Sequence, residues 1–271
     1  MATLPTVFVS HGAPTFANEP GLAGAQLRAL GQALDKPQAI LVVSPHWMTR
    51  SVEITATAQP DTIHDFGGFP RALYAIQYPV AGSPQLAARV KQVLSPRGIT
   101  ASLDSRRGLD HGAWVPLLHM YPDADVPVVQ VSIPFDTDEA KALALGRALA
   151  PLAAEGVLIV GSGSLTHNLY EFRMGDAHEA GYAREFSLWV RDAVVHGDMH
   201  RIAQALRDAP HAARAHPTTE HFLPLLVAAG AAGAPTPTTV LDGGIRHGVL
   251  AMESYVFGQR VTLQVQEVAH A

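Results

Sequence analysis

Short apolar runs rich in β-branched residues recur along this chain, and they constrain its fold more than any other feature. They cover Thr6–Ser10, Ala39–Ser44, Val126–Ile133 and Val157–Val160. Continuous apolar runs of this kind are typical of strands that are buried on both faces, as in a parallel sheet. A helical pattern from Gly21 to Leu34 separates the first two runs, with leucines along one face. This strand–helix–strand spacing predicts a βαβ unit whose strands are parallel neighbours.

The rest of the chain continues the alternation of strands and helices. Further helical patterns cover Thr137–Glu155, Glu179–Val195 and Thr218–Ala229. Thr238–Leu241 is a candidate strand, and Val249–Phe257 with Val261–Val265 is a candidate antiparallel pair, whereas Asp61–Pro84 is a long excursion rich in glycine, proline and aromatic residues. We find no repeat and no dividing linker, so we expect one α/β domain over residues 1–271. Its central sheet is predicted to be mixed but mostly parallel, with helices on its faces.

The composition excludes several classes of function. The chain is 48% hydrophobic and 16% charged with a formal net charge of −5, which disfavours both intrinsic disorder and a basic nucleic-acid-binding surface. No window matches a membrane span or a signal peptide, so we expect a cytoplasmic protein that binds neither membrane nor nucleic acid. Because cysteine is absent, disulfides, thiolate nucleophiles and Fe–S clusters are excluded. The 14 histidines are therefore the residues to examine for metal or proton chemistry.

Two histidines directly follow predicted strands. His11 comes after the first strand, and His46 comes after the second. Ligands of open parallel sheets bind outside the carboxyl ends of the strands. Two imidazoles at one sheet edge can share a metal ion that lies about 2.1 Å from each nitrogen. Either histidine alone is better explained as a polar loop residue, whereas the pair favours a site.

Two further histidines lie in segments that have no simple structural explanation. His167 follows a third predicted strand, within Gly161–Leu169. That segment lacks the lysine of a phosphate-binding loop and the residue order of a nucleophile elbow, so we expect it to hold an imidazole at the same crevice. His111 lies beside Asp110 in Gly108–Leu117, which fits neither helix nor strand periodicity.

Near the last predicted helix, Glu220 and His221 are both candidate metal ligands. We expect them in the first turn, with Thr218 or Thr219 as the cap; Glu220 could alternatively serve only the helix dipole. Of the other histidines, the ones predicted to be rim residues at most are His64, His119, His216 and His247. Those predicted to be ordinary surface residues are His178, His196, His200, His211 and His270. The aromatic residues predicted to serve packing, with a lid over a flat substrate as the alternative, are Phe66, Phe69, Tyr74 and Tyr78.

Six short sequence motifs that contain these residues occur in order along the chain. They are Ser10–Pro14, Ser44–Trp47, Phe66–Pro70, Gly108–Trp114, Gly161–Leu169 and His216–His221. Together they resemble the DODA-type extradiol aromatic ring-opening dioxygenases, which form the 4,5-DOPA dioxygenase branch of the class III, LigB-like superfamily. Met252–Gly258 continues the likeness, so the resemblance covers nearly the whole chain.

The resemblance implies a single catalytic extradiol dioxygenase domain with one mononuclear divalent metal. His11 and His46 match the first two ligands, and the position of the third matches His221 rather than Glu220. His167 matches the acid–base histidine, within bonding reach of the ion in zinc-loaded forms, and His111 matches a second histidine of the pocket. Fe(II) is expected for activity, with Zn(II) as an alternative occupant. The expected substrates are O₂ and a catechol such as DOPA or caffeate, which is opened to a semialdehyde.

Two other functions stay open on the sequence alone. The same histidines could hold Zn²⁺ in a hydrolase, or the chain could be a non-catalytic LigB-like binding module. The presence of His111 and His167 argues against the second alternative, because neither is needed for binding alone. The sequence does not select the catechol. Candidate partners for a substrate carboxylate are Arg71, Arg106 and Arg246.

Overall fold

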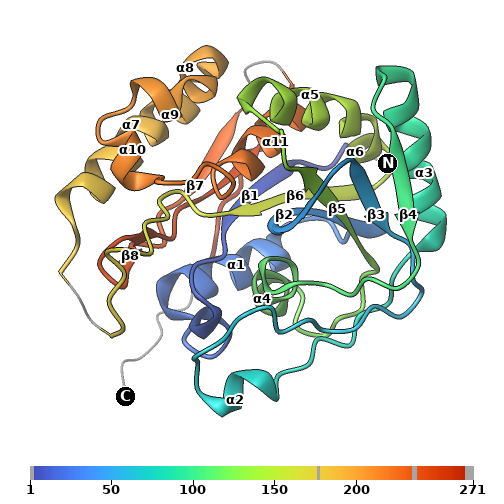
Figure 1. The fold of residues 1–271 in the computed structure, drawn as a ribbon, viewed down its shortest axis with the longest axis horizontal. Helices are drawn as coiled ribbons and strands as arrows, with labels where there is room; N and C mark the ends of the chain where they lie inside the picture. The colour runs from blue at the N-terminus through green and yellow to red at the C-terminus, as the bar shows by residue number, and fades with distance from the viewer. Residues whose placement is uncertain (1–2, 176–177, 234–236, 266–271) are drawn as a thin grey trace.

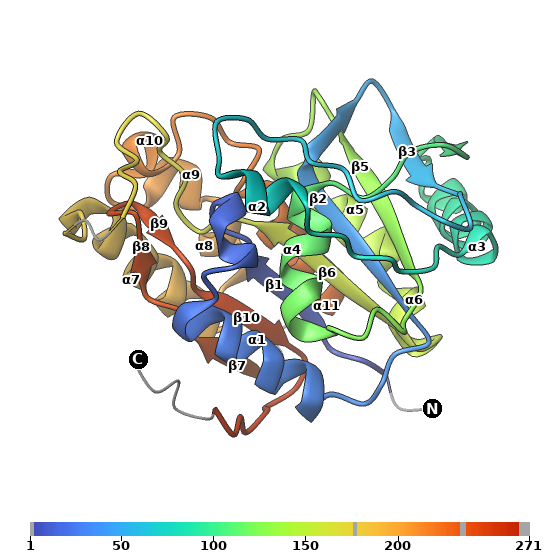
Figure 2. The same cartoon turned by 90° about the horizontal axis from the view of Figure 1, so that it is seen from below.

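A mixed sheet forms the centre of the computed structural model, which describes residues 3–175, 178–233 and 237–265 (Figures 1 and 2). Its strand order is β4-β3-β5-β2-β6-β1-β10-β7. The strands are β1 (Thr6–Ser10), β2 (Ala39–Thr49), β3 (Val52–Thr55), β4 (Ala101–Asp104), β5 (Val128–Pro134), β6 (Val157–Gly163), β7 (Thr238–Leu241) and β10 (Ser254–Phe257). The central four, β5, β2, β6 and β1, run parallel, whereas β10 is antiparallel to both β1 and β7. The predicted α/β class with a mostly parallel mixed sheet is confirmed.

Helices cover both faces of this sheet (Figures 1 and 2). Those of ten or more residues are α1 (Gly21–Ala33), α3 (Pro84–Leu94), α4 (His111–Met120), α5 (Glu139–Leu149), α7 (Gly181–Val195) and α11 (Leu223–Ala232). The shorter ones are η1 (Pro14–Ala17), α2 (Arg71–Tyr74), η2 (Ser95–Arg97), α6 (Pro151–Ala154), α8 (Met199–Ala203), α9 (Ala205–Asp208) and α10 (Ala212–Ala215). A separate ribbon pairs β8 (Ile245–Arg246) with β9 (Leu250–Ala251).

The alternation of side chains along the strands divides the core into two layers. In β1, Val7 and Val9 join the layer under α1 and α4, whereas Phe8 joins the layer under α5 and α11. The residues of β2 divide in the same way, because successive side chains of a strand point to opposite faces. Both faces of the central strands are therefore buried, which explains their continuous apolar sequence.

The structure corrects the predicted pairing of strands. Strands β1 and β2 are each parallel to β6, which lies between them, so they are not neighbours. Residues 261–265 form no strand, and β10 pairs instead with β1 and β7, which occupy both of its edges. His11 and His46 still reach the same edge of the sheet, because their strands run in the same direction.

Two predicted helices have different bounds, and a proline explains each difference. The helix predicted over Thr137–Glu155 is divided into α5 and α6 at Pro151, which lacks the N–H that would continue the first helix. The helix predicted from Thr218 begins at Leu223, and Pro224 occupies its first turn without needing a hydrogen-bond partner for its nitrogen. No threonine side chain caps this helix, and His221 lies before it.

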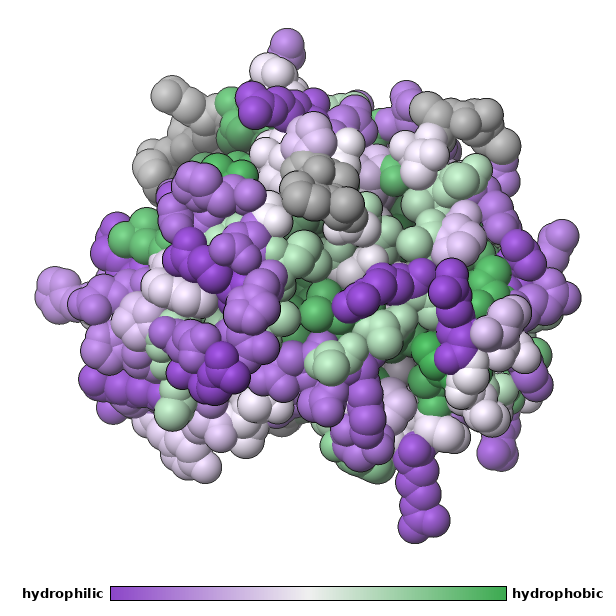
Figure 3. Space-filling model, turned by 90° about the horizontal axis from the view of Figure 1, so that it is seen from above, coloured by the Kyte–Doolittle hydropathy of each residue, from purple (hydrophilic) through white to green (hydrophobic). Residues whose placement is uncertain are grey.

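Most of one face of the molecule is hydrophilic, with apolar residues in small groups between polar ones (Figure 3). Among the helices of the described residues, none has both the length and the apolar character needed to cross a bilayer.

Candidate active site

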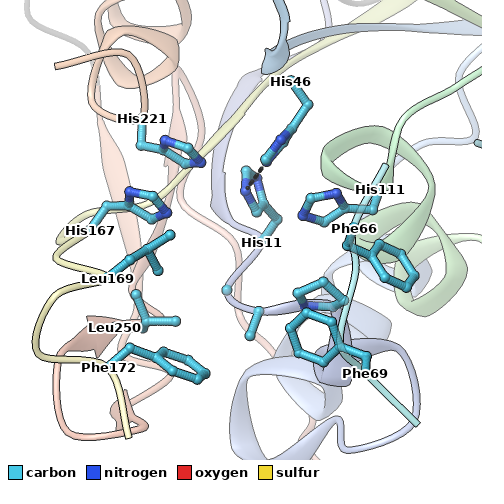
Figure 4. Close-up of a pocket in the computed structure, with 13 residues that line it drawn as sticks. His11, His46, Phe66, Phe69, His111, His167, Leu169, Phe172, His221 and Leu250 are labelled. Atoms are coloured by element: carbon cyan, nitrogen blue, oxygen red, sulfur yellow. Dashed lines mark hydrogen bonds between the residues drawn. The ribbon is translucent and has the colours of Figure 1, made fainter. Parts of the chain in front are cut away.

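Five histidines meet in one cavity of about 280 Å³ (Figure 4). His11 follows β1, His46 lies near the end of β2, and His167 follows β6. His111 is the first residue of α4, and His221 comes just before α11. All five were predicted from the sequence to share a site, and the structure brings them together from five separate segments.

Apart from its histidines, the cavity has apolar walls. These are formed by Gly12, Ala13, Pro14, Phe66, Phe69, Leu169, Phe172 and Leu250. Phe66 and Phe69 lie on one side, and Leu169, Phe172 and Leu250 lie opposite them (Figure 4). Phe66 and Phe69, two of the four aromatic residues considered in the sequence, therefore line the cavity wall.

The other two of these aromatic residues lie away from the cavity. The side chain of Tyr78 is buried in the core and donates its hydroxyl to the carbonyl of Tyr121. Tyr74 is 38% exposed and contacts Phe66. For these two residues the packing interpretation holds.

Two glycines let the backbone approach closely enough to place the histidines. A Cβ at Gly163 of β6 would lie 2.2 Å from the carbonyl oxygen of His221, so glycine allows the segment before α11 to rest directly on the strand. The N–H of Ser164 donates to that same oxygen at 2.9 Å. A Cβ at Gly112 would lie 2.3 Å from the Ser44 hydroxyl and 3.0 Å from the His46 ring, so glycine also allows α4 to begin beside His46.

The Nε2 atoms of His11, His46 and His221 have the spacing of a metal site. Their ligand atoms all lie within 4.8 Å of one another, and the Nε2 atoms of His11 and His46 are 3.2 Å apart. Two nitrogens about 2.1 Å from one ion, at an angle of about 90–110°, lie roughly 3.0–3.4 Å apart. The Nε2 of His221 is buried and has no hydrogen-bond partner among the described residues. This donor set fits a divalent metal ion.

For His11 and His221, a hydrogen bond on the far side of the ring leaves Nε2 as the acceptor nitrogen. The Ser162 hydroxyl donates its one hydrogen to the carbonyl of Gly112, so it accepts from Nδ1 of His11 at 3.0 Å. Nδ1 of His221 donates to Glu220 at 3.1 Å. Nδ1 of His46 lies 3.3 Å from a carboxylate oxygen of Asp65. Metal-binding histidines characteristically have such partners, which fix the tautomer and the ring orientation.

The tautomers of these rings determine which nitrogens can bind a metal ion. If His46, like His11, carries its proton on Nδ1, the 3.2 Å contact drawn as a dashed line in Figure 4 joins two acceptor nitrogens. Two lone pairs facing each other at this distance repel, and a cation between them removes the repulsion. Glu220 contacts the far side of His221, so its carboxylate serves the Nδ1 of that histidine.

Asp65 is a residue of the site that the sequence interpretation missed. Its carboxylate accepts from the backbone N–H of His111 at 2.8 Å and from Nδ1 of the same residue at 3.0 Å. Asp65 directly precedes the Phe66–Pro70 motif, and this position in the sequence could have indicated its role. Asp110, in contrast, is not among the residues that line the cavity; it caps α4 and accepts from Ser44.

The two remaining histidines of the cavity differ in their surroundings. The ring of His111 packs against that of His46 with centroids 4.0 Å apart. The ring of His167 lies parallel to that of His221, with centroids 3.5 Å apart and 9° between the planes. Glu220, His221 and His167 also bring ligand atoms within 4.8 Å of one another. His167 therefore lies directly beside the candidate metal ligands.

Burial favours the neutral form of His11, His46, His167 and His221. It lowers the pKa of His167 to about 4 and that of His46 to about 3, although Glu220 and Asp65 act in the opposite direction. Burial and then neighbouring histidines hold the pKa of His11 well below its ordinary value. Burial would raise the pKa of Asp65, but its hydrogen bond from His111 is part of a set of interactions that lowers it to about 2. The site thus combines four imidazoles that burial keeps neutral with the ionised carboxylate of Asp65.

We expect the metal-free protein to lose stability as the pH falls from 6.5 to 4. Burial lowers the pKa of His216, outside the cavity, to about 4. Below pH 6.5 the unfolded chain therefore binds more protons than the folded one, and the free energy of unfolding falls. This residue alone contributes roughly 3 kcal/mol to the loss. The four cavity histidines whose pKa is also lowered act in the same direction; they are His11, His46, His167 and His221.

Urea unfolding of the metal-free protein at pH 7, 5.5 and 4.5 measures this effect. The exposed His196 provides a control, because His196→Gln is expected to retain the same pH dependence. An unfolding free energy that stays constant between pH 7 and 4.5 would contradict the expectation.

None of the four histidines predicted as rim residues lines the cavity. His64, His119 and His216 each place Nε2 within 2.9 Å of a backbone carbonyl oxygen, and His247 lies 3.4 Å from the hydroxyl of Thr15. They are structural residues, because burial next to an acceptor explains each. The predicted surface histidines that the structure describes are exposed: His178, His196, His200 and His211. His270 lies outside the described residues.

No cationic side chain lines the cavity. All 19 lysine and arginine residues of the chain are among the described residues, and the lining contains none of them. The three arginines suggested as partners for a substrate carboxylate, Arg71, Arg106 and Arg246, are therefore not placed for that role. Arg246 instead lies 3.5 Å from the carboxylate of Glu19.

Comparisons with known proteins agree with the family resemblance. The family model described as the catalytic LigB subunit of aromatic ring-opening dioxygenase matches residues 21–258. The chain is 40% identical over 259 residues to an Escherichia coli K12 protein named 4,5-DOPA dioxygenase extradiol, covering 94% of this chain and 95% of that protein. It is also 40% identical over 256 residues to a Beta vulgaris protein of the same name, covering 93% and 96%.

A solved structure has the same fold. The crystal structure of an uncharacterized protein from Escherichia coli K12 matches with a TM-score of 0.78 and 35% sequence identity. The match covers 94% of this chain and 100% of that chain. The sheet and the helices described above are therefore those of a known architecture.

Proposed function

The chain belongs to the LigB family of aromatic ring-opening dioxygenases, and on this premise we propose that its five cavity histidines carry the extradiol cleavage of a catechol by O₂ to a semialdehyde. The observation that supports this assignment of roles is the convergence of ring nitrogens from His11, His46 and His221, which lie within 4.8 Å of one another. His111 and His167, the other two histidines, face the same cavity and remain free to handle protons.

We assign His11, His46 and His221 as the ligands of one mononuclear divalent metal, Fe(II) for activity, with Zn(II) as an alternative occupant. Triplet O₂ reacts slowly with a closed-shell catechol, and a redox-active metal supplies the electronic coupling between them. Three neutral imidazoles leave the positive charge of the metal ion uncompensated, whereas a ligand set of two histidines and one carboxylate would neutralise part of it. The ligand set therefore favours binding of the catechol as an anion.

His167 is proposed to accept a proton from the catechol. Because its pKa is lowered to about 4, the ring is neutral and able to accept a proton at any pH above about 5. Once protonated, its imidazolium is stabilised by the carboxylate of Glu220 and by the negative charge of the bound catecholate. His167 can later return this proton to an oxygen that becomes negative during ring opening.

His111 is proposed to stabilise negative charge that develops on oxygen. Its Nδ1 is bound to Asp65, so its Nε2 is the nitrogen left for the cavity. A proton that reaches Nε2 makes this nitrogen a hydrogen-bond donor toward the cavity, while Asp65 holds the ring through Nδ1. A fixed donor beside developing charge lowers the barrier more than a mobile water molecule does.

The apolar walls favour the flat ring of the substrate over its charged substituents. Phe66 and Phe69 face Leu169 and Leu250 across the cavity, with no cationic side chain between them. A substrate carboxylate therefore gains no ion pair there, and burying it without a partner would cost binding energy. We propose that a catechol without a carboxylate is turned over at least as well as DOPA or caffeate.

One experiment tests the activity and this specificity together. The protein is reconstituted anaerobically with Fe(II), mixed separately with 4-methylcatechol, caffeate or DOPA, and then exposed to O₂. We expect a yellow semialdehyde and uptake of one O₂ per catechol, with kcat/KM for 4-methylcatechol equal to or above the others. A tenfold preference for a carboxylate substrate would overturn the specificity. No O₂ uptake with any catechol, together with ester or amide hydrolysis by the zinc form, would overturn the dioxygenase function.

A further inference from the structure

We propose that Asp65 is a positioning residue that fixes the orientation of His46 and His111 simultaneously. Its Oδ1 lies 3.0 Å from Nδ1 of His111, and its Oδ2 lies 3.3 Å from Nδ1 of His46. One carboxylate thus contacts a candidate metal ligand with one oxygen and a candidate proton-handling residue with the other. The inference rests on the proposed function in one respect, which is that it takes His46 as a metal ligand.

The segment before Asp65 is fixed to the beginning of α4. The N–H of Ile63 donates to the carbonyl of Leu109 at 2.8 Å, and the N–H of Leu109 donates to the carbonyl of Asp61 at the same distance. The indole of Trp114 donates to the carbonyl of Ile63 at 3.0 Å. Because both sides of the contact are held by backbone groups, the position of the carboxylate relative to His111 is determined by the fold.

The chemistry of a carboxylate determines where the two rings keep their protons. An ionised carboxylate only accepts hydrogen bonds, so it favours the tautomers of His46 and His111 that carry hydrogen on Nδ1. The lone pair of each ring is then on Nε2, on the side of the cavity. For His46 this lone pair faces Nε2 of His11, at the proposed metal position.

Replacement of Asp65 by asparagine separates its two contacts. The amide has one accepting oxygen and one donating NH₂ group. The oxygen is expected to stay with His111, since the backbone N–H there cannot become an acceptor. The NH₂ group then faces Nδ1 of His46, and two donors cannot bond. His46 is expected to move its proton to Nε2, which removes the lone pair from the metal site.

The test uses the whole protein and two measurements that need neither catechol nor O₂. Long-range ¹H–¹⁵N spectra of the metal-free protein report the tautomer of His46, and competition with a chelator gives the dissociation constant for Zn(II). For Asp65→Asn we expect the Nε2–H tautomer and a dissociation constant that is about 10- to 100-fold higher. Asp61→Asn makes the same chemical change at an exposed position of the same segment and should leave both values as in wild type.

The outcomes distinguish this inference from the proposed function. If Asp65→Asn retains the wild-type tautomer and Zn(II) affinity, the positioning role is wrong. If that variant does not fold, Asp65→Glu is measured instead, where the displaced carboxylate is expected to weaken Zn(II) binding and an unchanged affinity would overturn the proposal. A wild-type protein that binds Zn(II) but opens no catechol would overturn only the proposed dioxygenase function.

Discussion

Replacement of His221 by alanine is expected to raise the dissociation constant for the divalent metal about a thousandfold and to abolish ring cleavage. If the total binding free energy of such a site is roughly 12 kcal/mol, one of three ligands contributes about 4 kcal/mol. The Nε2 of His221 is buried and has no other partner among the described residues, so its removal leaves no substitute at that position. Metal content after dialysis and chelator competition measure the effect.

The matched control for this prediction is the neighbouring carboxylate. Glu220→Gln removes the charge but keeps an oxygen that can accept from Nδ1 of His221. Its metal affinity is therefore expected to stay within about tenfold of wild type. If Glu220→Gln loses the metal and His221→Ala retains it, the third ligand is Glu220 and our assignment is wrong by one residue.

Replacement of His167 by alanine is expected to lower kcat by about 10²- to 10⁴-fold while the protein retains its metal. A positioned acid–base group contributes acceleration of this size. His167 is proposed to transfer protons, so the dissociation constant for the metal should change by less than about threefold. Stopped-flow measurement of semialdehyde formation by the Fe(II)-loaded variant, with its metal content determined on the same sample, tests both parts.

Imidazole in solution provides a second measurement on the same variant. The alanine leaves space beside the ring of His221, where His167 stacked. Free imidazole is expected to enter this space and restore part of the lost kcat. If His167→Ala instead loses its metal to the same degree as His221→Ala, His167 is a ligand and the proton must be handled elsewhere.

The sequence was informative about residues that follow strands. His11, His46 and His167 could be placed at one sheet edge because each directly follows, or lies near the end of, an apolar run that became β1, β2 or β6. Parallel strands end on the same side, so proximity followed from direction alone. Strand β6 lies between β1 and β2, which were predicted to be neighbours, but all three strands are parallel and still end at the same edge.

The partners of the histidines could not be predicted, because they come from loops and from contacts distant in sequence. Asp65 reaches His111 and His46 across an irregular segment whose course has no periodic pattern. The hydroxyl of Ser162, within β6, accepts from Nδ1 of His11, but its glycine-rich sequence surroundings do not indicate this contact. The start of α11 was predicted too early, because Pro224 belongs in its first turn and because the carbonyl of His221 accepts from Ser164, a contact that the sequence does not show.

The wide separation of the three proposed ligands, at positions 11, 46 and 221, has a consequence for how the protein is made. A ribosome has synthesised most of the chain before the third ligand emerges, so a chain that ends before residue 221 lacks one of the three ligands. Metal binding then stabilises the completed fold as a whole, by about 2.7 kcal/mol when the free metal is a hundredfold above its dissociation constant. Metal occupancy would therefore report that the chain extends past position 221 and that the segments carrying the three ligands have folded together.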